Sequence, residues 1–106
     1  MAWGYLLAAG LLECIWPLTL RASDGFTRLT PSIVTIVVGS ISLVLLSIAM
    51  REIPIGTAYA AWTGIGATGV AILGIILYAE PMSSARLICI SLIVAGVIGL
   101  RLVTNE

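Results

Sequence analysis

Long apolar stretches alternate with short polar breaks along the chain, and this pattern predicts four membrane-spanning helices. A helix that crosses a bilayer needs about 20 mainly apolar residues. Four stretches reach that length, at residues 3–21, 31–50, 55–79 and 85–103. Turn-forming residues mark the breaks, and Thr30 followed by Pro31 is typical of a helix start. Because every break is short, consecutive helices should run antiparallel, and we expect one all-α integral membrane domain over residues 1–106.

Composition agrees with a multi-pass membrane protein and excludes several other classes. Of the 106 residues, 60% are hydrophobic and 9% are charged, whereas soluble domains carry about 25% charged residues. Five arginines balance five acidic residues, so no basic patch is available for nucleic acid. The chain has no histidine, and Cys14 and Cys89 lack zinc-type spacing. We therefore expect no metal, no cofactor and no enzymatic activity.

One carboxylate departs from the pattern of charges at helix ends. Glu13 lies in the middle of the first apolar stretch. A charge at that depth costs from about 2.5 to more than 10 kcal/mol, depending on the reference state, so such a residue is a functional candidate by default. The alternative is a protonated glutamate that only links two helices. Because burial disfavours the charged form, a functional Glu13 would hold a proton when no cation is bound.

Residues one turn along from Glu13 add chemistry to the same helical face. Trp16 brings an indole N–H that can only donate. Pro17 cannot donate to the carbonyl of Glu13, so we expect a bend there and a free carbonyl near the site. A tolerated bend without a role is the alternative interpretation.

The third stretch has aromatic residues on one face, and their role has two interpretations. Tyr59 and Trp62 share that face with Gly66, and Gly64 and Gly66 should allow the helix to bend. Aromatic residues near a helix start are typical of the membrane interface. They also form walls around bound cations.

The fourth stretch contains neither acid nor aromatic residue, and its small residues predict a dimer contact. They are Ser91, Ala95, Gly96 and Gly99.

The charges in the loops predict little preference for one orientation in the membrane. Arg21, Arg28 and Arg86 lie on one side, and Arg51, Arg101 and the terminal amine lie on the other. Equal insertion in both orientations permits an antiparallel dimer, although a feature outside this count could still fix the topology.

Several motifs together resemble the small multidrug resistance family of bacterial exporters over essentially the whole chain. They are Glu13, residues 25–32 (GFTRLTPS) and residues 54–60 (PIGTAYA). Trp16, residues 62–67 (WTGIGA) and the basic residue Arg101 are similar to the branch that exports guanidinium. Arginine at 101, in place of the commoner lysine, and Pro17 depart from that branch.

The resemblance implies an antiparallel homodimer of dual topology in the bacterial inner membrane, a proton-coupled antiporter for guanidinium and small guanidinyl cations. Protons and substrate would compete for Glu13 of both subunits. Trp16, Ser42, Tyr59 and Trp62 match the residues that position this carboxylate, and we expect Trp16, Ser42 and Trp62 to donate hydrogen bonds to it. Three alternatives stay open: a broad quaternary-ammonium exporter of the same family, one subunit of a heterodimer, and a membrane scaffold that does not transport.

Overall fold

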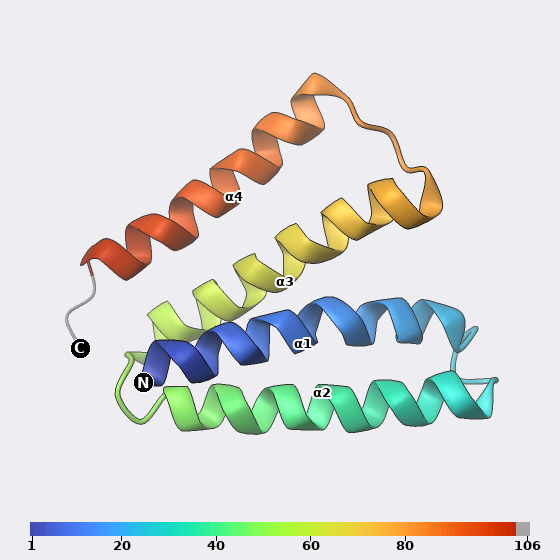
Figure 1. Ribbon diagram of the computed structural model, residues 1–106, viewed down its shortest axis with the longest axis horizontal. Coiled ribbons are helices and arrows are strands. Elements are labelled where there is room, and N and C mark those ends of the chain that lie inside the picture. Colours follow the sequence, from blue (N-terminus) through green and yellow to red (C-terminus); the bar gives the residue numbers. More distant parts are fainter. Residues whose placement is uncertain (104–106) are drawn as a thin grey trace.

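The protein, described by a computed structural model over residues 1–103, folds into four helices joined by short loops (Figure 1). They are α1 (Ala2–Ala22), α2 (Leu29–Ala49), α3 (Ile55–Tyr78) and α4 (Ser84–Val103). Each contains 20 to 24 residues and is apolar enough to cross a membrane. At 1.5 Å per residue these lengths correspond to about 30–36 Å, which matches the hydrocarbon core of a bilayer. Each helix begins and ends within two residues of the range expected from the sequence.

The start of α2 differs in detail from the expected cap at Thr30. Arg28 is the N-cap, in an extended conformation, so the helix begins at Leu29 and Pro31 is its third residue. The N–H groups of a first helical turn have no partner within the helix, so a proline is tolerated anywhere in that turn. The preceding loop is held by Ser23, whose hydroxyl donates to the carbonyl of Leu20 at 2.6 Å and accepts from the amide of Phe26 at 3.1 Å.

Helix α1 is the centre of the packing. It contacts α2 on one side and α3 on the other, whereas α4 diverges from the other three (Figure 1). The backbone of α4 packs along α3, and its Arg101 also reaches α1, where the guanidinium carbon lies 5.2 Å from the centre of the Trp3 ring. The main cluster of buried apolar residues comes almost entirely from α1, α2 and α3 and includes many alanines; its members are Ala2, Trp3, Leu6, Ala9, Leu46, Ala49, Ile53, Ala58, Ala61 and Trp62. Small side chains let helix backbones approach closely, which is the usual basis of helix association in lipid.

Glycines set the closest contacts between α1 and α3. A Cβ placed on Gly10 would lie 2.9 Å from the Cβ of Ile65, and one placed on Gly69 would lie 3.1 Å from the Cβ of Cys14. Both distances are shorter than the optimum of about 3.5–4.0 Å between carbon atoms. This tight α1–α3 seam fixes the position of Glu13, the residue that precedes Cys14.

Candidate functional site

Glu13 is buried at the seam between α1 and α3. Only 8% of its surface is exposed. Its side chain packs directly on the backbone of Gly66, where a Cβ would lie 2.9 Å from the Cβ of Glu13, 3.2 Å from its Cδ, and closer still to its Cγ. Gly66 therefore makes room for the carboxylate. The sequence alone indicates only that this glycine could let the helix bend.

Trp16 is the hydrogen-bond donor to this carboxylate. Its indole N–H donates to Oε1 of Glu13 from one turn further along α1. This contact is the one expected from the helical spacing. Because the indole engages Oε1, the other carboxylate oxygen stays available to a ligand.

Ser42 and Trp62 use their donors differently from the expected arrangement around Glu13. The hydroxyl of Ser42 donates to the carbonyl of Ala9 at 2.7 Å, and the indole N–H of Trp62 donates to Ser42 Oγ at 2.9 Å. Each group has one proton to give; Ser42 gives it to Ala9 and Trp62 gives it to Ser42, so neither donates to Glu13 within the subunit. The chain Trp62–Ser42–Ala9 instead joins α3, α2 and α1 one turn before Glu13.

Tyr59 lies outside the immediate surroundings of Glu13. It is 55% exposed, and its ring stands 5.6 Å from the ring of Trp62, at a tilt of 44°. It shares a helical face with Gly66 but precedes it by seven residues, or about 10 Å along the axis. One subunit therefore places Tyr59 on Trp62 and not on the carboxylate.

A cavity of about 290 Å³ opens beside Glu13, between α1 and α3. It is lined by Glu13, Trp16, Pro17, Thr63, Gly66, Ala67 and Val70. Glu13 is the single charged residue among these seven, so the cavity presents one carboxylate on an otherwise apolar and aromatic wall. Sequence spacing could have added Ala67 and Val70, because Ala67 follows Thr63, and Val70 follows Gly66, by four residues on one face of α3.

Trp16 also lines a second cavity, of about 340 Å³, that reaches α2. Trp62 also lines it, together with Thr35, Ile36, Gly39, Ser40 and Leu43. The indole of Trp16 is thus a wall shared by two cavities, and only one of them contains the carboxylate.

The two residue types expected to bend helices are found in continuous helices. Helix α1 runs through Pro17 to Ala22, and Pro17 lines the cavity. Helix α3 runs through both of its candidate glycines. Gly64 faces α4, where an added Cβ would lie 2.5 Å from Cγ2 of Val97. In the structure these glycines are contact points between helices, and bending at them stays a prediction.

The small residues expected to form a dimer contact lie on the unpacked side of α4. Ser91, Ala95 and Gly96 are exposed, and Gly99 is half-buried. A Cβ on Gly96 or Gly99 would meet no atom within 4 Å. The stripe is therefore free in one subunit, and its use in a dimer stays a prediction.

Comparison with known proteins identifies the family. A family model described as Small Multidrug Resistance protein matches residues 1–93. The chain belongs to the small multidrug resistance family. This result confirms the resemblance found in the sequence, and it makes the four apolar helices those of a multi-pass membrane transporter family.

Relatives named Guanidinium exporter match nearly the whole chain. A protein of Citrobacter freundii named Guanidinium exporter is 58% identical over 105 residues, which are 99% of this chain and all of the relative. Proteins with the same name from Yersinia pestis and from Salmonella typhimurium strain LT2 are 58% and 59% identical over 102 residues, covering 96% of this chain and 98% and 97% of the relatives.

Proposed function

We propose that this protein is a proton-coupled exporter of guanidinium and small guanidinyl cations. The observation that carries the proposal is the buried carboxylate of Glu13 on the wall of an otherwise uncharged cavity, with Trp16 holding one of its two oxygens. The relatives named Guanidinium exporter, at 58% identity over nearly the full length of both chains, support the choice of substrate.

The chemistry of the cavity suits this ion. Guanidinium is planar and carries N–H groups around its edge, and it pairs with a carboxylate through parallel hydrogen bonds. The apolar and aromatic walls strengthen the attraction between cation and carboxylate because they exclude water. A quaternary ammonium ion has no N–H to offer, so it cannot replace the hydrogen bonds that Glu13 gives up when water leaves.

Proton coupling follows from competition for the same carboxylate. Glu13 accepts a guanidinium ion only when it is ionised, and in an apolar cavity an ionised carboxylate without a cation is unfavourable. A proton therefore replaces the departing cation. Inward movement of protons then drives outward movement of the substrate, provided that the site opens to one side of the membrane at a time.

The same proposal includes an antiparallel homodimer in the bacterial inner membrane. Three positive charges on each side of the chain leave its orientation undetermined. The small-residue stripe on α4 is free to pack on another copy. Two copies in opposite orientations would bring two Glu13 carboxylates to one site, and these would titrate as a coupled pair.

The test is substrate-driven flux in proteoliposomes. Guanidinium, guanylurea and tetramethylammonium are compared for the wild type, for Glu13→Gln and for the matched variant Glu52→Gln, whose carboxylate is exposed in the α2–α3 loop. We expect guanidinium and guanylurea to be exchanged for protons by the wild type and by Glu52→Gln but not by Glu13→Gln. Near wild-type transport by Glu13→Gln would refute the mechanism, and equal transport of tetramethylammonium would refute the selectivity.

A further inference from the structure

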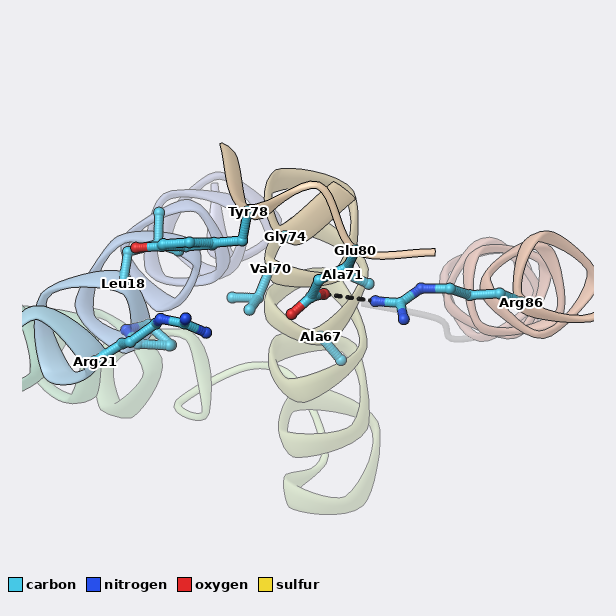
Figure 2. A pocket seen from close by; sticks show the side chains of 10 residues that line it. Leu18, Arg21, Ala67, Val70, Ala71, Gly74, Tyr78, Glu80 and Arg86 are labelled. Carbon is cyan, nitrogen blue, oxygen red and sulfur yellow. Dashed lines mark hydrogen bonds and ion pairs between the residues drawn. The ribbon is translucent and has the colours of Figure 1, made fainter. Parts of the chain in front are cut away.

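A third cavity, of about 320 Å³, lies where α1 and α3 end and α4 begins (Figure 2). Pro17, Ala67 and Val70 line this cavity and also line the cavity beside Glu13. The two cavities are therefore neighbours along the α1–α3 seam, and we refer to the pair as the groove, with Glu13 lining the inner cavity. We refer to the outer part, which contains Arg21, Tyr78, Glu80 and Arg86, as the vestibule.

The vestibule already holds two guanidinium groups, both of them from the chain's own arginines. Nη2 of Arg86, from α4, donates to Oε1 of Glu80 at 2.8 Å. The guanidinium carbon of Arg21, from α1, lies 4.1 Å from the centre of the Tyr78 ring. The two arginines reach into the vestibule from opposite sides (Figure 2). A carboxylate and an aromatic face are the two protein groups that bind guanidinium best.

The backbone turns Glu80 into the groove. Ala79 ends α3 in the left-handed conformation, with φ of 52°, and the amides of Ala79 and Glu80 both donate to the carbonyl of Gly74. The carboxylate then folds over the last turns of the helix, where a Cβ on Gly74 would lie 2.9 Å from Cδ of Glu80. A glycine at 74 therefore leaves the room that Glu80 occupies, as a glycine at 66 does for Glu13.

From this geometry we propose that Glu80 is an outer binding station for the transported guanidinyl cation, and that Arg86 occupies the station as an internal substitute until substrate displaces it. The inference rests on the function proposed above, and it adds a second carboxylate on the route to Glu13. The incoming ion carries the same N–H donors as the Arg86 side chain, so it can take the same position on the carboxylate.

Partial exposure makes the exchange reversible. The side chains of Arg86 and Glu80 are 32% and 38% exposed, and ion pairs near a surface are weak. When substrate arrives, the Arg86 guanidinium can move into water. The vestibule then holds two cations, Arg21 and the substrate, instead of three. A station that holds its ion weakly can pass it on. In the proposed antiparallel dimer, the two vestibules would open on opposite faces of the membrane.

The test compares guanidinium flux of Glu80→Gln, Arg86→Gln and the matched variant Glu52→Gln in proteoliposomes, with Glu13→Gln as the reference for the function itself. We expect Glu80→Gln to lower kcat/KM about two- to fivefold, the range that one partly exposed ion pair supports, with kcat unchanged. Arg86→Gln should raise kcat/KM because the internal competitor is gone. Glu52→Gln should match the wild type.

A structural role for the pair predicts a different result, and the exchanged variant Glu80→Arg with Arg86→Glu distinguishes the two. If the ion pair only ties α4 to α3, Glu80→Gln and Arg86→Gln should lower flux alike and the exchanged variant should restore it. That outcome, or a Glu80→Gln variant indistinguishable from Glu52→Gln, would overturn the station. Loss of transport in Glu13→Gln alongside unchanged Glu80→Gln would leave the proposed function intact.

Discussion

Replacing Gly66 with alanine should displace Glu13 while leaving the helices folded. The new Cβ would lie 2.9 Å from the Cβ of Glu13 and 3.2 Å from its Cδ, against an optimum of about 3.5–4.0 Å. The Cγ of Glu13 would be closer still, so the carboxylate or the α1–α3 seam must move by more than about 1 Å. Overpacking of this kind costs about 1–3 kcal/mol, and the better helix propensity of alanine offsets about 1 kcal/mol. The net loss of stability is thus at most about 2 kcal/mol.

The larger effect should fall on guanidinium binding, because the side chain that moves is the ligand group itself. If the full overpacking cost opposes the bound position of Glu13, affinity falls about 5- to 150-fold, at 1.4 kcal/mol for each factor of ten. The assay is isothermal titration of guanidinium into detergent-solubilised protein at a pH where the wild type binds. Thermal unfolding of the same samples reports stability separately.

The matched control is Gly56→Ala, in the first turn of the same helix. An added Cβ meets nothing within 4 Å there, so this variant should bind guanidinium like the wild type. Wild-type affinity in Gly66→Ala would refute the reasoning, because the close contact would then not determine where the carboxylate lies. Equal losses of affinity in Gly56→Ala and Gly66→Ala would also refute it, since a general effect on α3 would be sufficient.

Three further predictions concern the hydrogen-bonded chain, the proton and the orientation of the subunits. Ser42→Ala leaves the N–H of buried Trp62 without its acceptor, so the free energy of unfolding should fall by about 1–3 kcal/mol and transport should weaken. Ser47→Ala, at an exposed position on the same helix, should change neither stability nor transport. Apparent guanidinium affinity should weaken as pH falls, by up to about tenfold per unit once the protonated form dominates; titrations that stay flat from about pH 6 to 9 would argue against competition. Single cysteines in the α1–α2 loop, in a background without Cys14 and Cys89, should react with impermeant reagent from both sides of the membrane; labelling from one side only would contradict dual topology.

Contacts within one helix could be predicted from the sequence because helical geometry fixes them. The spacing of three residues places the indole of Trp16 beside Glu13, and the structure has that hydrogen bond. The ends of the helices follow from length, turn chemistry and capping, with an error of at most two residues. Helix α2 begins two residues earlier than expected. A proline is acceptable anywhere in the first turn, so Pro31 does not define the first residue of the helix.

Contacts between helices could not be predicted in the same way. Whether Ser42 donates to Glu13 or to the carbonyl of Ala9 depends on the depth and rotation of α2 against α1, which the sequence does not specify. The vestibule shows the same limit. Glu80 and Arg86 look like ordinary loop charges in the sequence, and only the left-handed turn at Ala79 directs the carboxylate back over Gly74 and into the groove.

The position of Tyr59 supports the proposal that two subunits share the site. Within the subunit its ring contacts Trp62 and is largely exposed, about 10 Å along α3 from the glycine that holds Glu13. Helix α4 also has a face without a packing partner in the subunit, since none of its residues is buried and an added Cβ on Gly96 or Gly99 would meet no atom within 4 Å. The resemblance to guanidinium exporters implies that Tyr59 positions the carboxylate, and in the proposed antiparallel homodimer it would do so for Glu13 of a second copy. The balanced charges and the free face of α4 both permit that arrangement.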